Sequence, residues 1–389
     1  MTQVLFTNVL PHDLLVENGR IADPRTARPG AETVDCGGGL ALPALVDAHI
    51  HPDKTTWGQP WLSREPANTL RELIDGDVAA RARMTAPVAE RAGALMDRAV
   101  AGGARAWRAH VDVAPVYGLD NVHGVRQAAD QRLDLLDVQI VAFPQLGLLS
   151  HPGTAALLER ALDEGADILG GLDPIGVDGD LHGHLDLLFG LAEAKGVPLD
   201  IHLHDRGESG LEQLLEIARR TRQTGLTVTV SHVFCIDKDL KSMGGGLGEL
   251  LAGSGVSLTT CALGADPVLP VADLTTKGVL VGLGSDGVRD PWTPFGDGDM
   301  IARTHLLAYR TDARTDEELA ACWATAAHGG ADLLGLERSE LHPGDPADFL
   351  VVQGTSPAQV VVDRPVPTHV VRGGRVVARD GHLLERTPR

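Results

Sequence analysis

The 389-residue chain has few cysteines and no cluster of them. Its four cysteines are far apart and form no Cys-x-x-Cys pair; they are Cys36, Cys235, Cys261 and Cys322. Neither a disulfide framework nor a structural zinc knuckle is therefore indicated. Because reduced thiols are the ordinary state in a cytoplasm, we expect a cytoplasmic protein.

Basic clusters and long apolar segments are also missing. The formal net charge is −19 and no run of Lys or Arg occurs. A surface that binds phosphates needs a basic patch, so the composition argues against a nucleic-acid partner. No apolar span of about 18 residues exists, and the N-terminus lacks the basic and apolar segments of a signal peptide. We therefore expect neither membrane association nor export.

The chain does contain alternating β-like and helical patterns between residues 45 and 335. The eight expected strands cover residues 46–51, 104–111, 138–143, 168–172, 199–204, 227–233, 257–261 and 279–285. Segments rich in Ala, Leu, Arg and Glu lie between them at helical spacing, and several end at a glycine. Eight such repeats close into a barrel more readily than they form an open sheet. We predict an α/β fold with a (β/α)8 TIM barrel over residues 45–335.

The two ends of the chain have a different pattern. Residues 1–44 and 336–389 hold short strand-like pieces separated by turn formers such as Asn18-Gly19 and Gly373-Gly374. Each end alone is too short to close a core. We expect both ends to pair into one small β-sandwich domain, an arrangement that also keeps the termini together.

Polar residues at the ends of the apolar strands are the most informative feature. His49 and His51 follow a buried run at a spacing of two, which places both imidazoles on one face of a strand. His202 and His232 end the fifth and sixth expected strands, and Asp286 follows the eighth. In a barrel these side chains would meet at one mouth. His49, His51, His202 and Asp286 together suit one divalent ion such as Zn²⁺ or Fe²⁺.

Other histidines carry weaker predictions. His110 and Asp112 end the second strand, where they could either orient metal ligands or simply pack at the strand end. We leave that choice open. The histidines expected on the surface or in loops are His123, His151, His182, His184, His328 and His342.

These residues resemble the pattern of the amidohydrolase superfamily, and finer motifs resemble its cytosine deaminase branch. The motifs are AHIHPD at 48–53 with GQP at 58–60, AHVDV at 109–113, QIVAFPQ at 139–145 and DPW at 290–292. The resemblance covers essentially the whole chain. It implies a metal-dependent barrel enzyme flanked by a split β-sandwich.

The resemblance also implies a role for individual residues. Asp286 would accept a proton from a water that the metal activates near neutral pH, and His232 would stabilise the tetrahedral intermediate. Asp205, three residues after His202, would carry a proton to the leaving nitrogen. Gln145 would bind the amide-like edge of a heterocycle, because its side chain both donates and accepts hydrogen bonds.

An absence of lysine bears on the number of metal ions. Binuclear members of the superfamily use a carboxylated lysine at the end of the fourth strand. This chain has no lysine between Lys54 and Lys195, and the fourth strand is followed by Asp173-Pro174. The resemblance therefore implies a single divalent ion.

Several positions depart from the cytosine deaminase pattern. Asp205 stands where the family has Glu, His204 precedes it, and SDG at 285–287 replaces the family's His-Asp-Asp. Lys54 adds a cation that cytosine recognition does not obviously need. These differences indicate another ring, or a substrate with an anionic or oxygen-rich edge. The substrate-binding candidates are Lys54, Gln145, His204 and Trp292.

The expected activity is hydrolytic removal of ammonia or a substituted amine from a small heterocycle such as a pyrimidine or triazine. One alternative is hydrolysis of an acyclic or lactam amide bond by the same site. Another is a binding protein that kept the scaffold without catalysis, although no catalytic group is missing. The partner in each case is a small heterocyclic amine or amide. Related proteins are often homo-oligomers, an expectation that extends to this chain.

Overall fold

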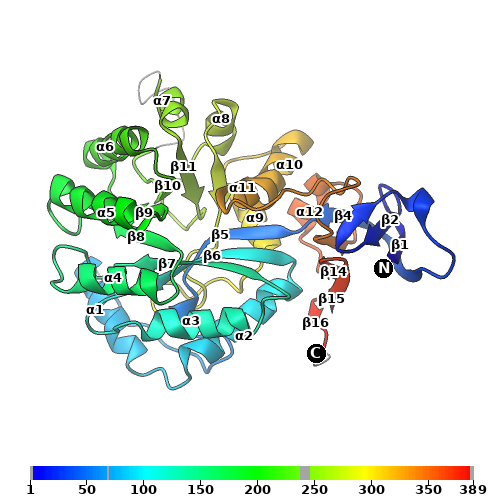
Figure 1. Cartoon of the computed structure of the whole chain (residues 1–389), viewed down its shortest axis with the longest axis horizontal. Coiled ribbons are helices and arrows are strands. Elements are labelled where there is room, and N and C mark those ends of the chain that lie inside the picture. Colours follow the sequence, from blue (N-terminus) through cyan, green and yellow to red (C-terminus); the bar gives the residue numbers. More distant parts are fainter. Residues whose placement is uncertain (1–2, 68–69, 237–245, 386–389) are drawn as a thin grey trace.

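The computed structural model describes residues 3–67, 70–236 and 246–385, and it contains two separate sheets (Figure 1). The larger sheet has eight parallel strands in chain order. They are β5 (Leu45–Ile50), β6 (Ala104–Asp112), β7 (Asp137–Phe143), β8 (Ile168–Leu172), β9 (Leu199–Leu203), β10 (Val228–His232), β11 (Val256–Thr260) and β12 (Val281–Leu283). All eight lie where the sequence predicts them, and the (β/α)8 barrel is confirmed.

The barrel closes between its first and last strands. A parallel bridge joins Ile50 to Asp286. The Asp286 amide donates to the His49 carbonyl at 2.8 Å, and the His51 amide donates to the Asp286 carbonyl at 3.2 Å. Three of the four residues predicted to bind the metal, His49, His51 and Asp286, thus take part in closing the barrel.

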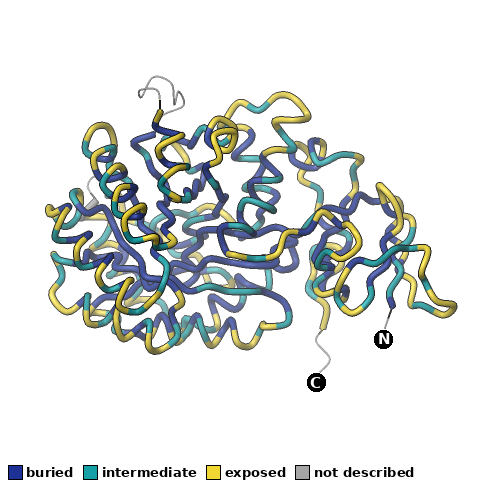
Figure 2. The backbone as a smooth tube through the Cα atoms, turned by 45° about the horizontal axis from the view of Figure 1, so that its top comes forward, coloured by how far each residue is buried: buried dark blue, intermediate teal, exposed yellow. Residues whose placement is uncertain are grey.

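Helices surround the barrel, and their inner faces are buried while their outer faces are exposed (Figures 1 and 2). They are α2 (Val88–Ala101), α3 (Asp120–Asp130), α4 (Thr154–Asp163), α5 (Leu181–Lys195), α6 (Gly207–Thr224), α7 (Leu247–Ser254), α8 (Val271–Thr276), α9 (Met300–Arg310), α10 (Asp316–Ala324) and α11 (Gly330–Leu333). In α2, Leu95, Met96, Ala99 and Val100 are fully buried, which is the spacing of one helical face. A further helix, α1 (Leu70–Arg81), stands on the long connection after β5.

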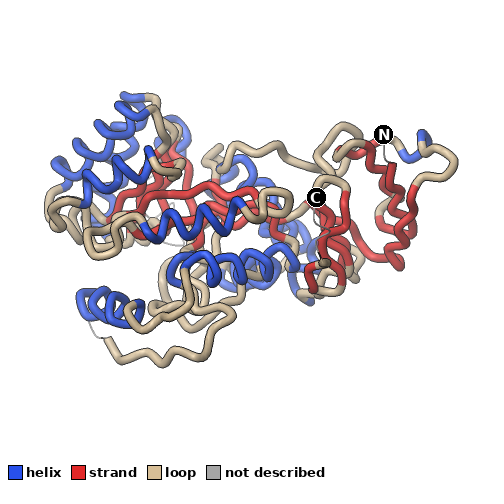
Figure 3. Tube along the Cα trace, turned by 60° about the horizontal axis from the view of Figure 1, so that its bottom comes forward, coloured by secondary structure: helices blue, strands red, loops and turns tan. Residues whose placement is uncertain are grey.

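The second sheet is built from both ends of the chain and lies to one side of the barrel (Figure 3). Its strands are β1 (Gln3–Leu10), β2 (Leu14–Glu17), β3 (Arg20–Ala22), β4 (Glu32–Pro43), β13 (Phe349–Val352), β14 (His369–Arg372), β15 (Arg375–Arg379) and β16 (His382–Leu383), with α12 (Pro357–Asp363) between β13 and β14. Phe6 and Phe349 meet in its core with ring centroids 5.0 Å apart. The small β-sandwich domain from both termini is confirmed.

One apolar run is shared between the two sheets. Residues 40–46 form one uninterrupted apolar run in the sequence, whereas β4 ends at Pro43 in one sheet and β5 begins at Leu45 in the other. Proline has no amide proton, so it suits the end of a hydrogen-bonded strand. The Ala44 amide donates to the Asp348 carbonyl at 3.1 Å, and the chain crosses from one domain to the other there.

The expectation for His184 is wrong. It is fully buried on α5, and its Nδ1 lies 2.7 Å from the Asp178 carboxylate. The same carboxylate accepts the backbone amides of residues 148–150 at 3.0–3.1 Å. Burial opposes the charge, but these hydrogen bonds outweigh it and hold the pKa of Asp178 well below its ordinary value.

We expect Asp178→Ala to lower the free energy of unfolding by about 2–4 kcal/mol, because several buried donors lose their acceptor. A carboxylate with a lowered pKa stabilises the fold fully above its unfolded-state pKa of about 3.9. That contribution is lost as the pH falls from there through the folded-state value. Urea denaturation at pH 7 measures the effect, with exposed Asp163→Ala as control. Equal stabilities of the two variants would contradict this account.

Candidate active site

The four predicted metal ligands lie together at the C-terminal mouth of the barrel. Nε2 of His51 is 3.3 Å from Nε2 of His202 and 3.3 Å from Oδ1 of Asp286. Nε2 of His49 is 3.6 Å from the same Asp286 oxygen. Two ligand atoms bound tetrahedrally to zinc, each about 2.0–2.1 Å from the ion, stand roughly 3.4 Å apart. These three separations are therefore those of ligands that share an ion. His49, His51 and Asp286 form one close group, and His202 forms another with His49 and His110.

The protonation of the imidazoles supports this fit. Burial lowers the pKa of His51 to about 3, and it lowers the pKa of His202 well below its ordinary value. Both rings are therefore neutral near pH 7 and can offer a lone pair. Nε2 of His49 is buried and has no hydrogen-bond partner among the described residues. Neutral imidazoles with unpartnered, converging nitrogens are suited to a cation.

Asp286 adds the negative charge to this group. Burial would raise the pKa of Asp286, but the imidazoles of His49 and His51 hold it well below its ordinary value. Its backbone is left-handed at φ 62°, a conformation that Asp tolerates better than most residues. Gly284 lets β12 approach β5 closely, because a Cβ there would lie 2.5 Å from the His49 Cβ. Backbone geometry thus places an ionised carboxylate against two imidazoles.

A buried polar chain fixes the orientation of His49, and the sequence did not identify it. Nδ1 of His49 is 3.0 Å from the Ser231 hydroxyl, which donates to Asp200 at 2.8 Å. Arg108 donates to the other Asp200 oxygen at 3.0 Å. These contacts leave Nε2 of His49 facing the cluster. The available signal was Asp200, a carboxylate two residues before His202 and hence on the same strand face.

His110 belongs to the same cluster. Its ring stacks on His49 with centroids 3.9 Å apart, and neither of its nitrogens has a hydrogen-bond partner in the described part of the chain. His49, His110 and His202 each offer an atom within 4.8 Å of the others. The sequence left open whether His110 orients metal ligands or only packs at the strand end. Its direct contact with His49 favours a role beside the ligands. Asp112, two residues on, instead contacts Lys54, with Oδ2 and Nζ 3.5 Å apart.

Three of the four substrate-binding candidates are brought together beside the histidines. Lys54 lies in a 3₁₀ turn (Pro52–Lys54) directly after His51, and it is only 3% exposed. Its Nζ donates to Oε1 of Gln145 at 2.6 Å and lies 5.6 Å from the ring centroid of Trp292. Burial would lower the pKa of Lys54, but surrounding carboxylates, Asp112 first, raise it above the ordinary value. The ammonium is therefore charged and orients the Gln145 amide.

The fourth candidate, His204, lies beside His232. The two rings stack with centroids 4.5 Å apart, and Nδ1 of His204 is 2.6 Å from the Asp173 carboxylate. Burial opposes protonation, but Asp173 raises the pKa of His204 above its ordinary value. Both nitrogens of His232 lack a hydrogen-bond partner among the residues that the structure describes. Its pKa is held well below the ordinary value, first by burial.

Asp205 lies at the same mouth of the barrel, and its carboxylate accepts two hydrogen bonds. The Gly176 amide donates to it at 2.8 Å, and Nε2 of Gln213 donates to the same oxygen at 2.7 Å. The side chain is half-buried. Its role in proton transfer to the leaving nitrogen stays a prediction.

Comparison with known proteins identifies the family. Residues 32–378 match the sequence profile of the amidohydrolase family. The chain belongs to the amidohydrolase family. This confirms the superfamily that the strand-end motifs indicate, and a protein of this family acts as a hydrolase.

Three relatives show how far the similarity extends. This amidohydrolase is 31% identical to N-isopropylammelide isopropyl amidohydrolase of Pseudomonas sp. (strain ADP), over 90% of this chain and 88% of that protein. It superposes on N-isopropylammelide isopropylaminohydrolase from Burkholderia multivorans with a TM-score of 0.93 and 40% identity, over 99% and 100% of the chains. For 5-methylcytosine deaminase from Klebsiella pneumoniae liganded with phosphonocytosine, the TM-score is 0.83 and the identity 26%, over the whole of both chains.

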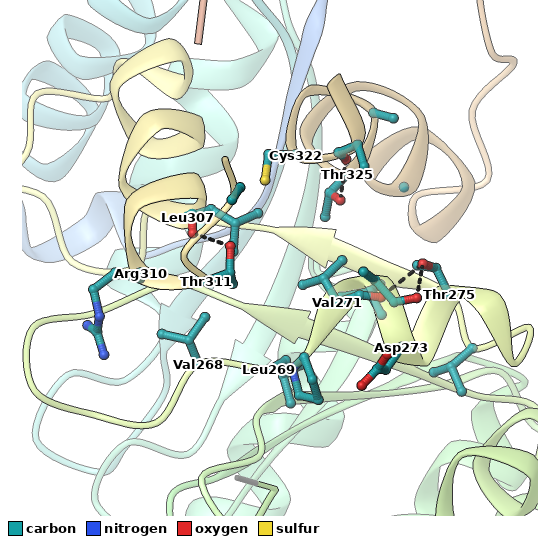
Figure 4. Close-up of a pocket in the computed structure, with 18 of the residues that line it drawn as sticks. Val268, Leu269, Val271, Asp273, Thr275, Leu307, Arg310, Thr311, Cys322 and Thr325 are labelled. Atoms are coloured by element: carbon teal, nitrogen blue, oxygen red, sulfur yellow. Dashed lines mark hydrogen bonds between the residues drawn. The ribbon is translucent and has the colours of Figure 1, made fainter. Parts of the chain in front are cut away.

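A large hollow of about 1050 Å³ lies elsewhere on the amidohydrolase (Figure 4). It runs between α8, α9 and α10, where Val268, Val271, Leu307 and Cys322 line it. None of the predicted site residues lines this hollow, so the histidine cluster remains the candidate active site.

The described part of this amidohydrolase contains no helix both long and apolar enough to cross a membrane. The helices around the barrel instead bury one face against it and expose the other (Figure 2).

Proposed function

We propose that this amidohydrolase is a metal-dependent hydrolase that removes ammonia or an alkylamine from a small nitrogen heterocycle. An aminated triazine is the first substrate class to test, and an aminated pyrimidine the second. The observation that carries the proposal is the placement of Lys54, Gln145 and Trp292 beside the four-ligand group. The 40% identical relative named for N-isopropylammelide supports the triazine class.

One divalent ion, Zn²⁺ or Fe²⁺, would be held by His49, His51, His202 and Asp286. The fit rests on the 3.3–3.6 Å separations of three pairs, His51 with His202, His51 with Asp286 and His49 with Asp286, and on the unpartnered nitrogen of His49. When bound, such an ion supplies Lewis-acid activation of water near neutral pH. His110 is close enough to support the same site.

The chain's own residues would handle the protons. Asp286 would take the proton from the attacking water, and neutral His232 would donate a hydrogen bond to the oxygen of the tetrahedral carbon. Asp205 would protonate the leaving nitrogen, since an amine leaves far more readily when protonated. His204 is the neighbouring group that can hold a proton, because Asp173 raises its pKa.

Lys54 and Gln145 would select the substrate edge. With Oε1 of Gln145 facing Lys54, its Nε2 points the other way and can donate to the ligand. A charged lysine and an amide donor favour a ring that carries carbonyl or oxyanion oxygens. Trp292 would stack against the ring. A cytoplasmic location and homo-oligomeric assembly belong to the same proposal.

The test is amine release from a panel of aminated triazines, pyrimidines, purines and pterins by metal-loaded protein. We expect ammonia or alkylamine from at least one triazine or pyrimidine. A carboxylate product without amine would favour amide hydrolysis instead. A panel that is uniformly negative at full metal occupancy would overturn the proposal.

Metal removal gives a separate prediction. We expect dialysis against a chelator to abolish turnover, and addition of Zn²⁺ or Fe²⁺ to restore it with one ion bound per chain. The reason is that the proposed ligand set would hold one ion, and the fourth strand supplies no lysine to bridge a second. Metal analysis by mass spectrometry alongside activity measures both. Two ions per chain at full activity would contradict the single-ion site.

A further inference from the structure

Asp77 on α1 is a buried carboxylate with no donor of its own. It is 1% exposed, and neither of its oxygens has a hydrogen-bond partner among the described residues. An ionised carboxylate buried without partners costs several kcal/mol. Such a group calls for a hydrogen-bond donor from outside the protein chain.

The position of α1 brings Asp77 to the substrate candidates. Arg81, one helical turn after Asp77, donates to Asp112 at 2.9 Å and also pairs with Asp53. This pairing attaches the end of α1 to the turn that carries Lys54. Asp77 precedes Arg81 by four residues on α1, so the two side chains lie on the same face of the helix, which is the face that meets Asp53 and Asp112.

The nearby cations are already engaged by other groups. Lys54 contacts Gln145 and Asp112, and Arg81 contacts Asp53 and Asp112. The buried carboxylates here are Asp53, Asp77, Asp112 and Asp290, and the cations beside them are Lys54, Arg81 and Arg91, the last of which donates to the Asp53 and Thr55 carbonyls. Asp53, Asp112 and Asp290 each accept at least one hydrogen bond through a carboxylate oxygen, whereas Asp77 accepts none among the described residues. Asp77 is therefore the carboxylate of this group that lacks a hydrogen-bond donor among the described residues.

We propose that Asp77 is a specificity-determining residue that accepts a hydrogen bond from an N–H group of the bound heterocycle. This inference rests on the proposed function. Lys54 donates and Asp77 accepts, so together they fit a ring edge on which a carbonyl oxygen is next to an N–H, as in an imide. Such a substrate supplies the donor that Asp77 lacks and lowers the cost of its burial. A ring without that N–H leaves the carboxylate unpaired.

The test compares two substrates across three proteins. The substrates are the best ring from the panel and its analogue with C–H in place of the edge N–H. The proteins are the wild type, Asp77→Leu and Asp75→Leu, the last an exposed position on the same helix. We expect the wild type and Asp75→Leu to prefer the N–H ring by about 10²-fold or more in kcat/KM. Asp77→Leu should lose most of that preference, chiefly through a higher KM.

Thermal unfolding separates this role from a structural one. Asp77→Leu removes a buried carboxylate that no hydrogen-bond donor satisfies, so it should unfold at a temperature no lower than the wild type. Asp77→Asn serves as a milder variant should the leucine protein fail to fold, and it should show a smaller loss of preference. A lower unfolding temperature with unchanged preference would overturn the inference. If both the wild type and Asp77→Leu release amine and both prefer the N–H ring equally, the inference about Asp77 fails and the proposed function stands. If the wild type releases no amine from any ring, the proposed function fails as well.

Discussion

Asp286→Asn is expected to lose its bound metal and to lower kcat/KM by at least about 10³-fold. The substitution removes the anionic member of the ligand group and the proposed proton acceptor, and proton transfer alone is worth about 10²–10⁴-fold. Asparagine is chosen because it tolerates the left-handed backbone of Asp286, which alanine would strain. Metal content and steady-state kinetics measured on the same preparation give both results.

A matched control for this variant exists in the chain. Asp312 has nearly the same left-handed backbone, at φ 59°, and is exposed on a distant loop. Asp312→Asn should keep full metal and activity. Retention of both by Asp286→Asn would show that Asp286 is not a ligand.

Lys54→Met should lower kcat/KM for the preferred heterocycle by about 10²-fold, because it removes a buried charged donor that also orients Gln145. It leaves Asp112 with Arg81 as its partner, so the fold should survive. Lys195→Met, at a partly exposed lysine paired with Asp163, is the control and should keep full activity.

A double-mutant cycle sharpens this prediction. If Lys54 orients the Gln145 amide, the double variant Lys54→Met/Gln145→Leu should lose little more kcat/KM than the weaker of the two single variants. The reason is that each substitution alone already disrupts the Lys54–Gln145 pair. Fully additive effects would mean that the two residues contact the substrate independently. Unchanged kinetics in both single variants would remove them from the substrate site.

The barrel could be predicted from the sequence because its signal is local. Several barrel strands are short apolar runs, and several of the surrounding helices have one apolar face, as β8 and α2 illustrate. The shared run at residues 40–46 could not be divided, because the break at Pro43 depends on which sheet each half joins. His184 was misplaced for a similar reason, since its partner Asp178 lies before the helix and contacts it only in the folded chain.

The candidate ligands could be predicted because parallel barrel strands all end at one mouth, so position along a strand is enough to place a side chain. The groups around them could not. Ser231, Asp200 and Arg108 look like ordinary strand residues until the barrel brings β6, β9 and β10 together. Asp77 sits on a helix outside the repeat, and its importance depends on burial that no motif encodes.

The most direct test of the central claim is mass spectrometry of the product formed in ¹⁸O-labelled water from an N-alkylaminated triazine. Hydrolysis at the ring carbon predicts an intact ring carrying one ¹⁸O atom and an unlabelled free amine. A ring-opened product with the label in a carboxylate would contradict the account, and so would the absence of any labelled product from fully metal-loaded protein.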